Sequence, residues 1–250
     1  MEVNTTIYCI VPFSKQAFEQ NAWNNFNQQL YKNKKLIVVQ NCGAKWCKKE
    51  DEIILESNDG VSQPMNVGLD WARQNSNKND WFTKFDCDDR YLSRYLNTIE
   101  DTIEKGAQIV GRNSCWIKNC DDKLWFVEGV SECWCNGQFC HGPTLAGRID
   151  ISPNFPVVAK FGEDELWWDL TRQYKQWIGP SHSFIYCRYK KANHAYPFSD
   201  DSFKDIYSGR LYESIKGTPE EDRPTEMKLI QKQLYSEDFD RMISEITGTK

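Results

Sequence analysis

The sequence has 250 residues, of which 40% are hydrophobic and 14% aromatic, which is typical of a globular protein and not of a disordered chain. Its formal net charge of -5 provides no general basic field, which argues against nucleic-acid binding through overall charge. No stretch approaches ~18 consecutive apolar residues and no signal-peptide pattern opens the chain, so we expect a cytoplasmic protein without a membrane span.

The first part of the chain alternates predicted strands and helices. Apolar, β-rich runs predict buried strands at residues 7–11, 36–39, 53–55, 81–85 and 108–110. Apolar residues at helical spacing predict amphipathic helices between them, at residues 18–30, 65–72 and 92–103. Strands joined by crossover helices are expected to be parallel. The predicted class is therefore α/β, with a doubly wound, mostly parallel sheet flanked by helices, whose ligands bind beyond the carboxyl ends of the strands.

The following part is less regular. Residues 112–141 are rich in cysteine and aromatic residues, and antiparallel strands are predicted at 114–118 and 124–127. We interpret this segment as an elaboration of the sheet. A loop and a strand follow at 142–148, and then a helix with acidic first residues, which suits the positive end of the helix dipole.

The chain is predicted to divide into one domain and one extension. Residues 1–200 carry the alternating elements and their elaboration, and we assign them to a single domain. Residues 201–250 become polar and then show helical spacing again, which predicts a C-terminal helical extension that packs on the core or on a partner.

An acidic motif follows the predicted strand at 81–85. In an extended backbone Asp86 and Asp88 lie on one side and Cys87 on the other, because a strand has period two. The two carboxylates could then share Mg²⁺ or Mn²⁺ and leave coordination sites for the oxygens of a diphosphate. A strand that ends in an acidic turn is the structural alternative, since Asp favours turns and helix N-caps. The spacing alone does not decide between them.

Taken together, these segments resemble family 2 glycosyltransferases with the GT-A fold, from Ile7 to about Pro197. The resemblance rests on the order and spacing of several motifs, namely Val11-Pro12-Phe13, Asn66-Val67-Gly68-Leu69-Asp70-Trp71-Ala72, Phe85-Asp86-Cys87-Asp88-Asp89, Gly142-Pro143-Thr144-Leu145-Ala146-Gly147-Arg148, Gly162-Glu163-Asp164, and Arg188-Tyr189 to Asn193-His194. It implies a GT-A-like sheet and a nucleotide-sugar donor, for which a UDP-sugar is expected.

The resemblance also implies roles for single residues. Donor binding falls to residues at the strand ends and in the neighbouring loops, namely Pro12, Phe13, Asn41, Asn66, Lys84, Asp86 and Arg188. Asp86, Asp88 and His194 would hold the metal that bridges the diphosphate, with Asp88 as the more direct ligand. Asp164 would take the proton from the acceptor hydroxyl. The chain departs from the family at the end of the second predicted strand, where Gln40 and its neighbour replace a common acid.

The chemistry of glycosyl transfer supports two of these roles independently. Displacement of a nucleoside diphosphate requires charge stabilisation on the leaving oxygens, which a metal on Asp86 and Asp88 would supply. It also requires a base near the attacking hydroxyl, for which Asp164 is the candidate. A single displacement should invert the anomeric centre. The structural alternatives are a helix cap for Asp164 and its neighbour Glu163, and a surface imidazole for His194.

Two other classes of function stay open. A nucleotidyltransferase can use a similar sheet and acidic metal site, although the loop after the first predicted strand lacks the Gly-rich, basic phosphate cradle typical of such enzymes. A zinc-stabilised binding module is the non-enzymatic alternative, because zinc prefers thiolate and imidazole ligands, which occur here at Cys115, Cys120, Cys133, Cys135, Cys140 and His141. Their spacing is irregular, and buried free thiols explain the cysteines better than structural zinc.

The acceptor is not specified by any motif. A glycan hydroxyl is one candidate, and a hydroxymethylated pyrimidine in phage-type DNA is another. A DNA acceptor would require the target base to be flipped out of the stack, and a phage-encoded enzyme would act in the host cytoplasm. The sequence leaves the oligomeric state open.

Overall fold

The computed structural model describes residues 5–47, 52–57, 60, 62–118, 124–127, 140–158, 162–187 and 210–211, with the backbone alone at 124–127, 180–182 and 210–211. The predicted extension at 201–250 therefore lies outside the described residues apart from one short strand. Over the described ranges, no helix has both the length and the apolar character needed to cross a membrane.

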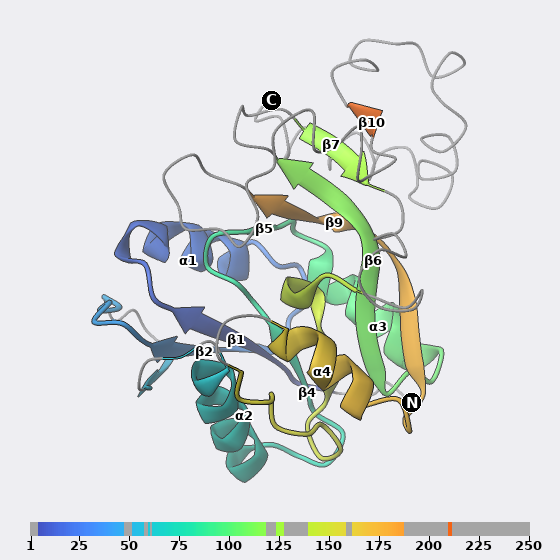
Figure 1. Cartoon of the computed structure of the whole chain (residues 1–250), viewed down its shortest axis with the longest axis horizontal. Helices are drawn as coiled ribbons and strands as arrows, with labels where there is room; N and C mark the ends of the chain where they lie inside the picture. The colour runs from blue at the N-terminus through green and yellow to red at the C-terminus, as the bar shows by residue number, and fades with distance from the viewer. Residues whose placement is uncertain are drawn as a thin grey trace.

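One sheet of ten strands organises the described chain (Figure 1). The strands are β1 (Ile7–Phe13), β2 (Lys34–Gln40), β3 (Ile53–Glu56), β4 (Trp81–Lys84), β5 (Arg90–Tyr91), β6 (Ile109–Lys118), β7 (Leu124–Val127), β8 (Ala146–Arg148), β9 (Gln176–Cys187) and β10 (Arg210–Leu211). Their order is β10-β7-β6-β8-β4-β1-β2-β3, and β9 pairs with β5 and β6. The β4-β1-β2-β3 half is parallel throughout, whereas β8 runs antiparallel between β4 and β6.

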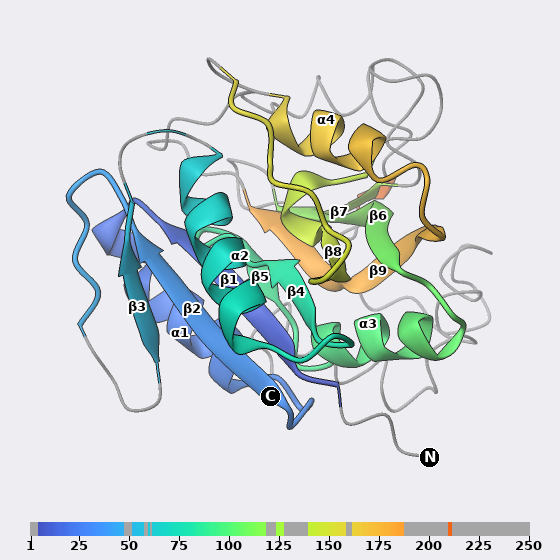
Figure 2. The same ribbon diagram turned by 90° about the horizontal axis from the view of Figure 1, so that it is seen from below.

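Helices cover both faces of the parallel half. They are α1 (Glu19–Asn27), α2 (Gln63–Asn75), α3 (Tyr95–Glu104) and α4 (Glu163–Leu170), with 3-10 turns η1 (Gln16–Phe18) and η2 (Gly142–Thr144). Figure 2 shows α2 across one face of β1 and β2, with α1 behind them. The approach of α2 is close: a Cβ on Gly68 would lie 2.5 Å from a methyl group of Ile10, so a side chain at position 68 would force the helix off the sheet.

The side chains of β1 explain why helices cover both faces of the sheet. Side chains along a strand point alternately to opposite faces, and in β1 both sets are apolar. Ile7, Cys9 and Val11 belong to the core that includes residues of α1 and α3, whereas Tyr8 and Ile10 belong to the core that includes residues of α2 and α4. The α/β class and the doubly wound parallel arrangement predicted for the first part of the chain are therefore confirmed.

Some local predictions are corrected. The predicted helix at 18–30 is wrong at its end, because α1 stops at Asn27 and Leu30 is 47% exposed. The two strands predicted at 108–110 and 114–118 form the single strand β6. No bounds were predicted for β9, whose sequence contains Gly179 and Pro180; these two residue types interrupt the pattern on which strand prediction depends.

Candidate active site

The candidate site lies where the parallel strands end. Phe13, Gln40 and Glu56 are register partners at the last positions of β1, β2 and β3, and β4 ends nearby at Lys84. The carboxyl ends of neighbouring parallel strands meet at one edge of the sheet, which is where α/β sheets bind ligands. We call residues 86–89, which follow β4 at this edge, the acid loop.

The acid loop is a turn and not an extension of β4. The strand ends at Lys84 and residues 87–88 form a turn, so the strand periodicity assumed from the sequence does not reach Asp88. The side chains of the two acids are nevertheless separated from that of Cys87, as predicted: those of Asp86 and Asp88 are 24% and 19% exposed, whereas Cys87 is buried. The turn therefore presents both carboxylates towards the site.

Lys84 is the cation at the centre of the site. It is 7% exposed, and its Nζ lies 2.8 and 3.0 Å from the two carboxylate oxygens of Asp164. The same Nζ is 3.9 Å from Asp86 and 3.9 Å from Glu163. Burial alone would lower the pKa of Lys84, but Asp164, Asp86 and Glu163 outweigh it and raise that pKa above its ordinary value. Lys84 therefore stays charged and joins β4 to the first turn of α4.

The turn η2 completes the surroundings of Asp164. A Cβ on Gly142 would lie 1.8 Å from Asp164 Oδ2, so only glycine allows η2 to lie against this carboxylate. The hydroxyl of Tyr91 donates to the Pro143 carbonyl at 2.9 Å and accepts from the backbone N–H of Asp86 at 2.8 Å. Tyr91 thus connects η2 to the acid loop, and three segments that are remote in sequence converge on one site.

The carboxylates of the site repel one another. Burial raises the pKa of Asp86 to about 7; Lys84 opposes this shift, while Asp88, Asp164 and Glu163 add to it. The pKa of Glu163 is also raised, by burial and then by Asp164. An additional cation at this site would relieve the repulsion and favour the ionised form of Asp86. The electrostatics therefore suit a site that takes up positive charge with its ligand.

A second lysine, in the loop after β1, contacts the acid loop. Lys15 follows β1 by two residues, and its Nζ lies 2.8 Å from Asp88 Oδ2. The ammonium group also lies 5.7 Å from the ring centroid of Phe18. Sequence analysis missed Lys15, because no periodic signal singles out a lysine in a loop.

A row of amide side chains on α1 and just beyond it holds the acid loop and the residues that follow it in place. They occur at helical spacing, at Asn21, Asn25, Gln28 and Gln29, and donate to the main-chain carbonyls of Cys87, Asp89, Tyr91 and Leu92. Sequence analysis missed this role as well, since it used only the apolar positions of this helix. The signal that marks it is a polar stripe at i, i+4, i+7 and i+8.

Replacing Asn25 by Ala should destabilise the protein by about 2 kcal/mol. Asn25 is 2% exposed; it donates to the Asp89 carbonyl at 2.7 Å and accepts from the Tyr91 amide at 3.2 Å. Its removal takes the hydrogen-bond acceptor from the buried Tyr91 amide, at a cost of about 1–3 kcal/mol before any relaxation, whereas the Asp89 carbonyl keeps a hydrogen bond from Asn21. Urea unfolding of Asn25→Ala and of Asn27→Ala, an exposed change on the same helix, measures the difference. Equal stability of the two variants would contradict a role for Asn25 in holding the loop.

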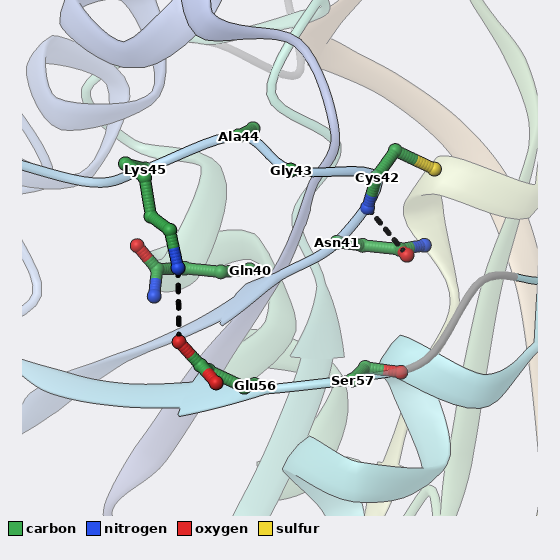
Figure 3. Close-up of a pocket in the computed structure, with 8 residues that line it drawn as sticks. All are labelled: Gln40, Asn41, Cys42, Gly43, Ala44, Lys45, Glu56 and Ser57. Atoms are coloured by element: carbon green, nitrogen blue, oxygen red, sulfur yellow. Dashed lines mark hydrogen bonds and ion pairs between the residues drawn. The ribbon is translucent and has the colours of Figure 1, made fainter.

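A pocket of about 480 Å³ opens at the ends of β2 and β3, on the same edge of the sheet as the acid loop (Figure 3). It is lined by Gln40, Asn41, Cys42, Gly43, Ala44, Lys45, Glu56 and Ser57. The Asn41 side chain accepts from the Cys42 amide at 2.7 Å and donates to the Gly60 carbonyl at 3.1 Å. Lys45 forms an exposed ion pair with Glu56 at 3.1 Å. The pocket is therefore polar, and one of its two charged groups is a cation.

The other residues expected to bind the donor are placed as follows. Pro12 and Phe13 end β1, but Phe13 is fully buried and its ring packs edge-on against Trp46 at 5.0 Å, so its ring supports the site from within. Asn66 uses both ends of its amide on the main chain of Phe155, at 2.9 and 2.7 Å. It thus ties α2 to the segment before α4. Arg188 and His194 lie outside the described residues.

The acid loop offers two carboxylates to a cation. Within the described ranges, no group of three or more His, Cys, Asp and Glu side chains is arranged to hold a metal ion. Asp86 and Asp88 offer two hard oxygen donors, which fits Mg²⁺ or Mn²⁺ when the phosphates of a ligand supply the rest. Of the cysteines in the zinc hypothesis, Cys115 and Cys140 are buried and not part of a disulfide, whereas Cys120, Cys133 and Cys135 lie outside the described residues.

No family model and no curated protein matches the sequence. Solved structures with a similar fold are known. One is S. aureus TarS 1-349 in complex with UDP-GlcNAc, with a TM-score of 0.53 and 14% sequence identity over 80% of this chain and 64% of that one. Another is the mannosyltransferase PcManGT from Pyrobaculum calidifontis in complex with GDP-Man and Mn²⁺, with a TM-score of 0.50 and 14% identity over 77% of this chain and 59% of that one.

These similarities define the fold. The chain has the GT-A-like α/β fold predicted from its motifs, with a parallel half-sheet covered by helices on both faces. It spans less than two thirds of the length of both proteins. Both of those structures contain a nucleotide-sugar, and one of them also contains Mn²⁺.

Proposed function

We propose that the protein is a metal-dependent, inverting glycosyltransferase that moves a hexosyl group from a nucleotide-sugar to an acceptor hydroxyl. The observation that carries the proposal is the cluster around Lys84. It brings the acid loop after β4 together with Asp164, which lies 80 residues after Lys84 in the chain, at the carboxyl edge of a GT-A-like sheet. The complexes of the similar structures support a nucleotide-sugar as the donor.

The residues of the cluster would have different roles in the reaction. Asp86 and Asp88 would hold Mn²⁺ or Mg²⁺, with His194 as a further ligand, and the ion would supply Lewis-acid stabilisation to the departing diphosphate. Asp164 would accept the proton of the attacking hydroxyl. Lys84 fixes the carboxylate of Asp164 through two contacts, so the base is oriented before the acceptor arrives.

The polar pocket at the ends of β2 and β3 suits the nucleoside part of the donor. It adjoins the edge at which Asp86 and Asp88 lie, and Asn41 and Lys45 offer hydrogen-bonding groups and a positive charge. Among donors we expect a UDP-sugar. The acceptor would be a glycan or, for a phage-type enzyme, a hydroxymethylated pyrimidine in DNA. Transfer to DNA would depend on local basic residues, since the net charge of -5 provides no general attraction.

Calorimetry with UDP-glucose, UDP-GlcNAc and GDP-mannose, each with and without Mn²⁺, tests the proposal. We expect one donor to bind only in the presence of Mn²⁺ and to be hydrolysed slowly to the nucleoside diphosphate. Release of pyrophosphate from a nucleoside triphosphate would instead indicate nucleotidyl transfer. Tightly held stoichiometric zinc, with no binding of any of the three donors, would favour the binding module.

A further inference from the structure

Lys15 and Lys84 neutralise the acidic site in different ways. Lys84 is buried and has three carboxylates within 3.9 Å, so it is a permanent part of the site. The side chain of Lys15 is 35% exposed, and its ion pair is with Asp88, whose side chain is 19% exposed. Partly exposed ion pairs contribute about 0–1 kcal/mol. The contact of Lys15 with Asp88 is therefore one that a ligand can replace at little cost.

The contact occupies an oxygen that the proposed function requires. Lys15 Nζ lies 2.8 Å from Oδ2 of Asp88, the residue expected to be the more direct metal ligand. A divalent ion on Asp88 would repel an ammonium group at this distance. The same ion would arrive with the two phosphates of the donor, whose oxygens are strong acceptors for a lysine. The backbone of Lys15 is extended, with φ -133° and ψ 105°. Its side chain is a flexible four-carbon stem, so the ammonium group can change position by rotation about side-chain bonds.

We propose that Lys15 is a donor-positioning residue that exchanges partners during binding. In the donor-free protein its ammonium group pairs with Asp88, and when metal and nucleotide bind it transfers to the diphosphate oxygens. This inference rests on the proposed function. It adds to that function a residue of the loop after β1 and a competition between the ammonium group and the metal for one carboxylate.

The exchange predicts effects of opposite sign in Lys15→Met, which keeps most of the apolar stem beside Phe18. Without nucleotide, Mn²⁺ should bind about 3- to 5-fold more tightly, because no ammonium group competes for Asp88. With saturating Mn²⁺, UDP and inorganic pyrophosphate should bind about 10- to 100-fold more weakly, because a charge-assisted hydrogen bond to phosphate is lost. Lys15→Arg keeps the charge and should stay within a few-fold of the wild type in both measurements.

Electron paramagnetic resonance of free Mn²⁺ measures the first affinity and calorimetry the second. The matched control is Lys32→Met, an exposed lysine just before β2 and so at the opposite edge of the sheet; it should change neither affinity. If Lys15 only stabilised the loop, both affinities would fall together in Lys15→Met or neither would change, and either result overturns the inference. If the wild-type protein bound neither UDP nor pyrophosphate with Mn²⁺, the proposed function itself would fail, and the inference with it.

Discussion

Replacing Asp164 by Asn should lower kcat by about 100-fold or more while leaving the affinities for Mn²⁺ and donor nearly unchanged. The amide has the size of the carboxylate and still accepts a hydrogen bond, but it is not a base. In the structure the Asp164 carboxylate contacts Lys84 Nζ through both oxygens. Its role as a helix cap, which the sequence left open, thus gives way to an ion pair as the structural alternative.

The ion pair makes a stability measurement necessary beside the rate. Asn at position 164 removes one charge partner of the buried Lys84, although Asp86 and Glu163 remain at 3.9 Å, so we expect a lower melting temperature as well. If Asp164 served only as the ion-pair partner of Lys84, its replacement would lower the melting temperature and leave turnover of the folded enzyme intact. Asp169→Asn, which alters an exposed ion pair on the same helix, is the control and should affect neither. Normal turnover in Asp164→Asn would move the search for the base to Glu163.

Replacing Asp88 by Ala should abolish turnover and weaken Mn²⁺-dependent donor binding. A site with two protein carboxylates loses half of its charged donors, and the diphosphate loses the ion that neutralises it. The fold should survive, because the side chain is partly exposed and its ion pair with Lys15 is of the weak, solvent-screened kind. Calorimetric titration with Mn²⁺ and UDP, together with kcat, measures both effects.

The neighbouring acid Asp89 provides a matched contrast. It is 1% exposed, and its Oδ1 accepts a hydrogen bond from the Cys187 amide of β9 at 2.8 Å. Asp89→Ala should therefore lower the melting temperature, since it removes a hydrogen bond from a buried amide, whereas Asp88→Ala should affect metal binding at nearly constant stability. Substantial Mn²⁺-dependent turnover in Asp88→Ala would remove this residue from the metal site.

Local sequence patterns predicted the architecture of the parallel half of the sheet. The apolar runs of β1 and β2 and the helical spacing in α2 reflect the burial of side chains on elements that follow one another in the chain. They predicted a parallel sheet with helices on both faces. The same pattern placed Asp86 and Asp88 just after a buried strand, at the edge where ligands bind. Local periodicity carries this information because strands and helices repeat every 2.0 and 3.6 residues.

The contacts between polar side chains could not be predicted from the sequence. Lys84 and Asp164 are 80 residues apart, and Lys15 and Asp88 are 73 apart; no periodic signal connects such pairs. Nothing in the sequence indicated a partner for Asp89, yet its side chain is buried and accepts a hydrogen bond from the Cys187 amide of β9, 98 residues further along the chain. Hydrogen bonds and ion pairs act over about 3 Å and depend on direction, so their partners are settled by how distant segments pack and not by the residues beside them in the chain.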